Sequence, residues 1–193
     1  MQSCLGIYIE DNLIKYAKVQ KDRDNIKVEA FGTKFYENIQ QAIDQIVAET
    51  NSSKIPISIN LSEEYYDYFS YFALLNKNAL KKSIDIDFEM LCSEKGVNKD
   101  DMERKNIFAL DQDDAQKMKA INVSIEKNTL DSKKALFEKY NLATIEPLPI
   151  GIMNLIKLDN NSNELIVNME EKTTLTFCEN GQIDKIDEIE TSI

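Results

Sequence analysis

The sequence contains no histidine, and this single absence excludes several kinds of functional site. Without an imidazole the chain cannot form a Ser-His-Asp or Cys-His catalytic group, or a metal site built on histidine. Only five glycines are present, and neither G-x-x-x-x-G-K-S/T nor G-x-G-x-x-G occurs, so P-loop and Rossmann phosphate sites are not expected. We therefore predict that the chain is not an enzyme and holds no metal ion.

The three cysteines, Cys4, Cys92 and Cys178, are too few and too far apart to form a paired zinc motif. Each lies among apolar neighbours, so we expect buried free thiols, as in a reducing compartment. The N-terminal segment has no basic region, which argues against a signal peptide. No apolar run approaches the ~20 residues of a membrane span. We therefore expect a soluble cytoplasmic protein without direct membrane insertion.

The charge balance is acidic, with 34 carboxylates against 23 Lys and Arg and a formal net charge of −11. Nucleic acids and anionic lipids are both bound through clustered basic residues, so neither is an expected partner. Three acidic pairs resemble cation sites at first sight, but such pairs are usually solvated surface. They are Glu63-Glu64, Asp100-Asp101 and Asp113-Asp114.

The first sixty residues predict the order β-β-β-α-β. Short alternating segments over the first thirty residues, separated by polar turns, indicate an antiparallel meander. An apolar stripe at helical spacing between Ile39 and Val47 then predicts a helix. Alternating apolar residues from Ile55 to Leu61 predict the strand that follows.

The middle of the chain predicts a smaller α/β segment. Six aromatic residues between Tyr65 and Phe72 favour a strand. A helix should follow and end at Gly96, and a strand pair should surround the acidic turn at 111–114. We expect a further helix over 130–140, capped by Asn128 or Thr129.

The C-terminal third predicts a short helix and a hairpin. Pro147 or Pro149 suits the first turn of the helix. Residues 164–183 alternate around Asn180-Gly181, which is a favoured tight-turn pair. The isoleucines of residues 182–193 fit neither a strand nor a helix period.

Two segments together resemble the actin-like PilM family of type IV pilus assembly, to which the cell-division protein FtsA is more distantly related. The first is CLGIYIEDNLIK with the later EAFG, and the second is LIVNMEEKTTLTFCENGQI. Residues 76–92 resemble the helix of the family's inserted subdomain, and residues 145–157 resemble its interlobe helix. The resemblance implies a mixed α/β fold with an actin-like (ribonuclease H-like) first lobe, an inserted small α/β subdomain and the start of a second lobe.

The resemblance also implies a division of the chain. Residues 1–64 and 143–158 would form the core of the first lobe, and 65–142 the inserted subdomain with its returning elements. Residues 159–193 would open a second lobe that the family continues further. We therefore expect a truncated second lobe, and an exposed hairpin at 164–183 through which copies of the chain could associate.

The two phosphate loops implied by the resemblance depart from the family pattern. Tyr8, Glu10 and Asp11 stand where the family has Asp, Gly and Ser, and Asn168 and Glu170 stand where it has Asp and Gly. Like charges ~4 Å apart cost roughly 4 kcal/mol at an effective dielectric constant of 20, so these acidic residues would repel a triphosphate. The degenerate loop positions are Tyr8, Glu10, Asp11, Asn12, Lys15, Asn168 and Glu170. We therefore expect no bound ATP.

The resemblance implies a cytoplasmic scaffold, peripheral to the inner membrane, that docks the N-terminal tail of a PilN-like inner-membrane protein. The groove would lie between the first lobe and the inserted subdomain. Its expected contacts are Tyr66, Tyr68, Tyr71, Leu80, Ile84 and Phe88. One alternative is an ATP-binding switch or filament protein, for which ATP and Mg²⁺ would be cofactors. Another is a cytoplasmic domain of the GspL type from a secretion system.

Overall fold

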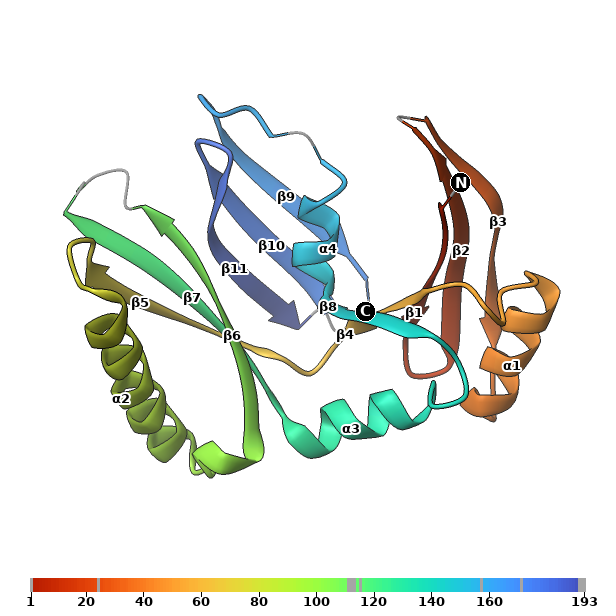
Figure 1. Cartoon of the computed structure of the whole chain (residues 1–193), viewed down its shortest axis with the longest axis horizontal. Helices are drawn as coiled ribbons and strands as arrows, with labels where there is room; N and C mark the ends of the chain where they lie inside the picture. Colours follow the sequence, from red (N-terminus) through yellow and green to blue (C-terminus); the bar gives the residue numbers. More distant parts are fainter. Residues whose placement is uncertain are drawn as a thin grey trace. The chain divides into compact units, whose positions relative to one another are not determined.

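The computed structural model describes residues 2–23, 25–110, 114, 116–156, 158–170 and 172–190. The chain divides into two compact units, each of which is formed by two stretches of sequence (Figure 1). Unit 1 comprises Met1–Ser62 and Asp131–Gly151, and unit 2 comprises Glu63–Leu130 and Ile152–Ile193. The three-part division expected from the sequence stays a prediction.

Unit 1 contains a five-stranded sheet with the strand order β3-β2-β1-β4-β8. Its strands are β1 (Gln2–Ile9), β2 (Leu13–Asp22), β3 (Asn25–Phe35), β4 (Ile57–Leu61) and β8 (Leu142–Pro147). The first three strands form the predicted antiparallel meander, whereas β4 lies parallel to β1 and β8 lies parallel to β4. Helix α1 (Ile39–Glu49) joins β3 to β4 and supplies the crossover that a parallel strand requires.

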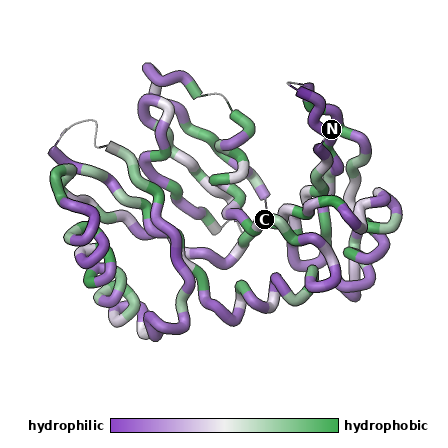
Figure 2. Tube along the Cα trace, in the orientation of Figure 1, coloured by the Kyte–Doolittle hydropathy of each residue, from purple (hydrophilic) through white to green (hydrophobic). Residues whose placement is uncertain are grey.

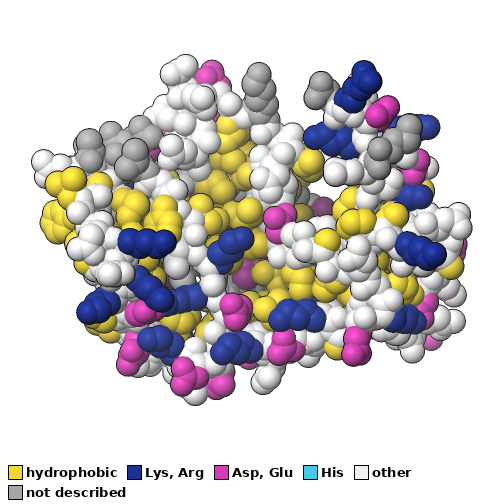
Figure 3. All heavy atoms as spheres, in the orientation of Figure 1, with side chains coloured by type: hydrophobic (Ala, Val, Ile, Leu, Met, Phe, Trp, Pro, Cys, Tyr) yellow, Lys and Arg dark blue, Asp and Glu magenta, His cyan; other side chains and the backbone are white. Residues whose placement is uncertain are grey.

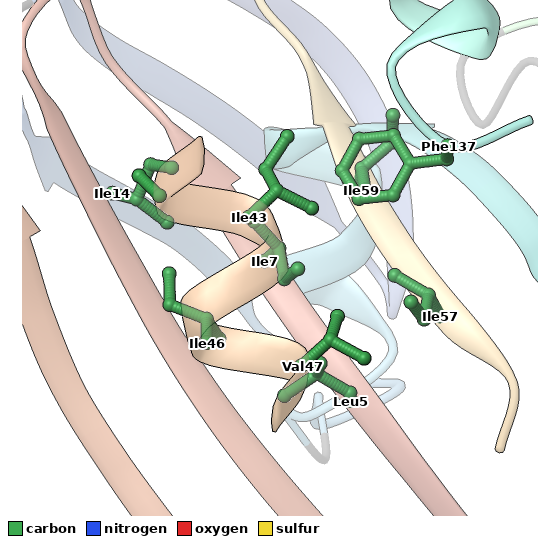
Figure 4. Packing of buried hydrophobic residues seen from close by; sticks show 10 residues of the cluster. Leu5, Ile7, Ile14, Ile43, Ile46, Val47, Ile57, Ile59 and Phe137 are labelled. Carbon is green, nitrogen blue, oxygen red and sulfur yellow. The ribbon is translucent and has the colours of Figure 1, made fainter. Parts of the chain in front are cut away.

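The core of unit 1 lies between α1 and one face of this sheet. The helix contributes the predicted apolar stripe, and β1, β2 and β4 contribute the facing side chains (Figure 4). The buried cluster comprises Leu5, Ile7, Ile14, Ala42, Ile43, Ile46, Val47, Ile57, Ile59 and Phe137. A fully buried aliphatic side chain stabilises the fold by about 1.5–3 kcal/mol. The cluster therefore fixes α1 on the sheet.

Unit 2 contains two three-stranded antiparallel sheets, with the orders β5-β7-β6 and β11-β10-β9. The strands are β5 (Tyr65–Phe72), β6 (Met102–Leu110), β7 (Lys117–Glu126), β9 (Asn163–Met169), β10 (Lys172–Glu179) and β11 (Gln182–Glu190). Helix α2 (Lys77–Lys95) and the 3-10 helix η1 (Lys99–Asp101) connect β5 to β6. The buried residues of α2 are Ile84, Phe88 and Cys92, spaced four apart, so one narrow stripe of the helix packs inward.

Local side-chain chemistry sets several of these boundaries. The Asn38 side chain accepts a hydrogen bond from the Gln41 N–H at the start of α1, and Asn76 caps α2 in the same way. Gly96 ends α2 in the left-handed conformation, with φ of 69°. Asn180 and Gly181 have φ of 50° and 78°, the positive values that a tight hairpin turn requires, so the predicted turn is confirmed.

Helix α3 (Lys127–Ala135) and helix α4 (Leu148–Met153) differ in how well the sequence predicted them. Helix α3 begins at Lys127, so Asn128 and Thr129 lie inside it, and their predicted capping role is wrong. The helix also ends at Ala135 rather than at 140, because residues 136–139 form turns. Helix α4 has Pro149 in its first turn, as expected. Most of the predicted acidic turn at 111–114 lies outside the described residues.

Strand β11 was not predicted, and a β-bulge explains why. The register between β10 and β11 shifts at Phe177/Cys178, so Ile183 pairs with Cys178 and Ile186 pairs with Thr176. Because Cys178 and Thr176 lie on one face of β10, the bulge places both isoleucines on that face although they are three residues apart.

Hydrophilic residues interrupt the helices and strands throughout (Figure 2). No helix among the described residues is long and apolar enough to cross a membrane.

Candidate functional site

The turn between β1 and β2, where the first phosphate loop was expected, is closed by its own residues. The Glu10 N–H donates to the Leu13 carbonyl at 2.9 Å, and the Glu10 carbonyl accepts from the Tyr36 hydroxyl at 2.5 Å. Lys15 Nζ lies 3.0 Å from Glu10 Oε1 and 5.4 Å from the centre of the Tyr8 ring. The basic side chain that would attract a phosphate therefore already pairs with a carboxylate of the same turn.

The rest of this turn is equally acidic or polar. Asp11 and Asn12 are exposed, and the Ile9 N–H donates to Asn60 Oδ1 at 2.8 Å. A phosphate-binding turn uses backbone N–H groups that point toward the anion. Here the N–H groups of Ile9 and Glu10 both have partners within the protein. This arrangement favours a structural turn.

The turn between β9 and β10, where the second loop was expected, places Asn168 opposite Thr174 in the hairpin register. Both side chains are at least half-buried, and neither Asn168 Nδ2 nor Thr174 Oγ1 has a hydrogen-bond partner within the protein. Glu170 follows in the turn and is half-buried. The Glu170 carboxylate would repel a triphosphate at this turn.

Strand β5 presents its aromatic residues to two different neighbours because side chains alternate along a strand. On one face, the Tyr71 hydroxyl donates to Asp87 Oδ2 of α2 at 2.7 Å, and Asp67 pairs with Lys95 at 2.8 Å. On the other face lie Tyr66 and Tyr68. The aromatic segment is therefore divided between α2 and the second sheet of unit 2.

Tyr68 joins the two sheets of unit 2. Its hydroxyl donates to the Ile186 carbonyl at 2.6 Å and accepts from the Ile186 N–H at 2.7 Å. Burial raises the pKa of Tyr68 to about 12, although the hydrogen bond from the Ile186 backbone acts in the opposite direction. A second link is the ion pair of Lys119 with Asp184, at 2.5 Å. Tyr68 is thus an internal anchor as well as a partly exposed side chain.

The six expected partner contacts fall into three groups. Tyr71, Ile84 and Phe88 are 7%, 6% and 2% exposed and belong to the clusters that hold α2 on its sheet. Leu80 packs beside them and is half-buried. Tyr66 is half-buried and Tyr68 is exposed, and both hydroxyls are hydrogen-bonded. Their role in partner binding stays a prediction, but in this structure most of them serve packing.

The outward side of α2 carries residues that the sequence reasoning missed. Ile86 and Met90, one turn apart, are each 59% exposed. With Glu89, Ser93 and Glu94 they line a shallow depression of about 530 Å³. Basic and acidic side chains are interspersed in the region of α2 and η1 (Figure 3). The sequence feature that could have indicated this surface is the apolar pair Ile86 and Met90, which is offset by two residues from the buried stripe of α2.

Glu64 was expected to be solvated surface, and this prediction is wrong. The residue is only 6% exposed, and its Oε1 accepts a hydrogen bond from the Tyr66 hydroxyl at 2.7 Å. By contrast, Asp101 of the pair in η1 is exposed, as expected. No group of three or more Cys, Asp or Glu suited to a metal ion occurs among the described residues.

Replacing Tyr68 with phenylalanine should destabilise the protein by about 1–2 kcal/mol, because two hydrogen bonds at the hydroxyl are lost. The unfolding free energy of the unchanged protein should also fall as pH rises from about 10 toward about 12. In that range the unfolded tyrosine ionises while the folded one stays neutral, and Tyr68→Phe should reduce this fall. Urea unfolding at several pH values measures both effects.

Tyr65→Phe is the matched control, since Tyr65 lies on the same strand and is 41% exposed against 39% for Tyr68. It should change the unfolding free energy by less than about 0.5 kcal/mol. Equal effects of the two substitutions would contradict the anchoring role of Tyr68.

Comparison with known proteins identifies the fold. No protein-family model and no curated protein sequence matches the chain. A chain of the PilM-PilN type IV pilus biogenesis complex matches with a TM-score of 0.75 and 9% identity, over 97% of this chain and 61% of that chain. This chain therefore spans less than two thirds of that relative.

The cytoplasmic domain of EpsL, an inner membrane component of the type II secretion system of Vibrio cholerae, matches with a TM-score of 0.67 and 9% identity. The match covers 98% of this chain and 71% of that one. A Bacteroides thetaiotaomicron protein with an actin-like ATPase fold and unknown function has a TM-score of 0.48 and 13% identity. The mixed α/β fold predicted from the PilM resemblance is confirmed for this chain, because it is shared with the chain of the PilM-PilN complex and with the EpsL cytoplasmic domain.

Proposed function

We propose that this chain is a cytoplasmic docking module that binds the N-terminal tail of a PilN-like inner-membrane protein and acts as a scaffold without ATP. The observation that carries the proposal is the match of nearly the whole chain to a chain of the PilM-PilN complex. The absence of histidine and the closed, acidic turn at Glu10 support a role without catalysis. A non-enzymatic platform is the function that best fits these features.

The outward side of α2 is the surface that we propose for the tail. Ile86 and Met90 form an apolar floor, and Glu89 and Glu94 supply negative charge beside it. Lys99 lies 3.2 Å from Glu89 and neutralises part of that charge. A short tail with apolar residues and a basic side chain complements such a surface. The proposed occupant is therefore a basic, partly apolar segment of the membrane partner.

A second candidate function is that of a cytoplasmic domain of a type II secretion component. The match to the EpsL cytoplasmic domain, which covers 98% of this chain, favours it. Both functions use a platform beside the inner membrane and differ in the partner. The identity of the membrane protein encoded by a neighbouring gene distinguishes the two.

The docking proposal predicts that Ile86→Lys weakens binding of the partner's N-terminal peptide by at least about tenfold. The substitution places a cation on an apolar floor and removes buried contact area. Fluorescence anisotropy with a labelled synthetic peptide of the neighbouring membrane protein measures the affinity. Ile26→Lys is the control, because Ile26 is 66% exposed on β3 and receives the same change of charge. Unchanged affinity in Ile86→Lys would rule out this surface.

The proposed independence from ATP predicts no saturable heat when Mg·ATP is titrated into the protein at micromolar concentrations. The reason is the negative charge of Glu10 and Glu170 at the two turns, together with the engagement of Lys15 by Glu10. Isothermal titration calorimetry is the measurement. Micromolar affinity for Mg·ATP would instead support the switch or filament alternative.

We also propose that copies of the chain associate through the hairpin at 164–183. Among the described residues β9 pairs only with β10, and residues 165–169 of this edge contain neither a charge nor a proline. Leu165, Val167 and Met169 are 53%, 50% and 80% exposed. An edge strand of this kind invites pairing with another strand.

Association through β9 predicts a concentration-dependent sedimentation coefficient that Val167→Lys abolishes. A lysine on the edge strand introduces charge repulsion between the two copies. Val28→Lys is the matched control, since Val28 is 54% exposed on β3, an edge strand of the other unit. A monomer at all concentrations, or equal association of Val167→Lys, would refute this contact.

A further inference from the structure

A buried carboxylate in unit 2 has one oxygen without a partner. Glu64 lies between β4 and β5 and is 6% exposed. Its Oε1 accepts a hydrogen bond from the Tyr66 hydroxyl, whereas Oε2 has no partner within the protein. A buried charge is strongly unfavourable unless a donor or an opposite charge compensates it. Glu64 Oε2 is therefore a buried acceptor that would be stabilised by a hydrogen-bond donor.

A second carboxylate, Glu188 on β11, lies near Glu64. The Tyr68 hydroxyl bonds to Ile186, two residues before Glu188, and Tyr66, which bonds to Glu64, lies on the same face of β5 as Tyr68. Burial is the main cause that raises the pKa of Glu188, the nearby Lys172 ammonium lowers it, and the charge of Glu64 raises it. Lys172 Nζ is 3.9 Å from Glu188 Oε2, at the outer limit of an ion pair. The Glu188 side chain is 33% exposed, so this end of the group is open to solvent.

Thr174 provides a further polar atom beside Glu188. It is 6% exposed, and its Oγ1 has no hydrogen-bond partner. In the register of the sheet Thr174 lies directly opposite Glu188, and directly opposed side chains project from the same face, about 5 Å apart at Cβ. Asn168 lies on the other side of Thr174, but its unpaired Nδ2 is a donor and adds nothing to cation binding.

The net charge of the neighbouring side chains determines which kind of ligand could satisfy the unpaired oxygen of Glu64. The two carboxylates, Glu64 and Glu188, outnumber the one nearby ammonium group, that of Lys172. This cluster of side chains therefore keeps a net negative charge. A phosphate would be repelled, and a neutral water would leave the charge uncompensated. A divalent metal is not the favoured occupant, because the described residues contain no group of three or more Cys, Asp or Glu that could hold a metal ion.

We propose that Glu64, Glu188 and Thr174 form a binding site for a single organic cation, a guanidinium or primary ammonium group. The planar fork of a guanidinium can donate to carboxylate oxygens and to a hydroxyl at the same time, and an ammonium has three donors. Tyr66 keeps Glu64 oriented by donating to its other oxygen. The site would lie beside the turn where the family resemblance places an anion, and it would bind the opposite charge. This inference goes beyond the docking proposal and does not depend on it.

The test is a titration of protein carrying ¹³C-labelled glutamate with ethylguanidinium chloride at constant ionic strength and pH 7. Saturable shifts of the Glu64 and Glu188 carboxyl signals are expected. In Glu188→Gln the dissociation constant should rise at least about tenfold, since a hydrogen bond to a charged group is lost. Glu126→Gln, an exposed carboxylate at the end of β7, should leave binding unchanged.

Three outcomes would overturn the proposal: no saturable shift, equal binding by Glu188→Gln, or saturation by MgCl₂ in place of ethylguanidinium. Glu64→Gln is measured in parallel, with circular dichroism to verify that it folds. Because Glu188 is partly exposed, its variant keeps the test decisive if Glu64→Gln fails to fold.

A parallel arm uses the capped peptide acetyl-Gly-Arg-Gly-amide. Tighter binding of the peptide than of ethylguanidinium identifies a protein side chain as the source of the cation, and the reverse order identifies a free small molecule.

Discussion

The two hydrogen bonds at the Tyr68 hydroxyl hold together the part of the molecule that carries its candidate sites. They connect the side chain of β5 to the backbone of β11 at one residue, Ile186. Glu64 precedes Tyr68 by four residues, and Glu188 follows Ile186 by two. The joint therefore also determines which carboxylates meet at the proposed cation site. The Lys119–Asp184 ion pair supports the same joint from β7.

A shared fold does not by itself imply a shared ligand, so the chemistry of the two turns has to be considered separately from the fold. A nucleotide-binding turn needs backbone N–H groups directed at the phosphate and a net positive field. In this chain Lys15 pairs with Glu10, and the Glu10 N–H is used to close the turn. The side chains of the first turn favour internal pairing.

Much of the fold could be predicted because its patterns are local. The α1 stripe and the Asn180-Gly181 turn each depend on residues that are near one another in sequence. Helix α2 was harder, because it carries two apolar stripes and the sequence alone does not show which of them, that of Ile84 or that of Ile86, packs inward. Glu64 was misjudged because adjacent carboxylates are usually solvated, and its burial depends on strands far away in the sequence.

The alternation of β5 has a consequence for how this protein can change. Asp67 and Tyr71 bond to α2, whereas Tyr66 and Tyr68 form their hydrogen bonds on the opposite face of β5. Each face of the strand is therefore formed by every second residue. A single-residue insertion or deletion would exchange the two sets and break both interfaces at once. Substitutions of similar shape disturb only one neighbour. The strand should therefore tolerate single substitutions of similar shape but not insertions or deletions.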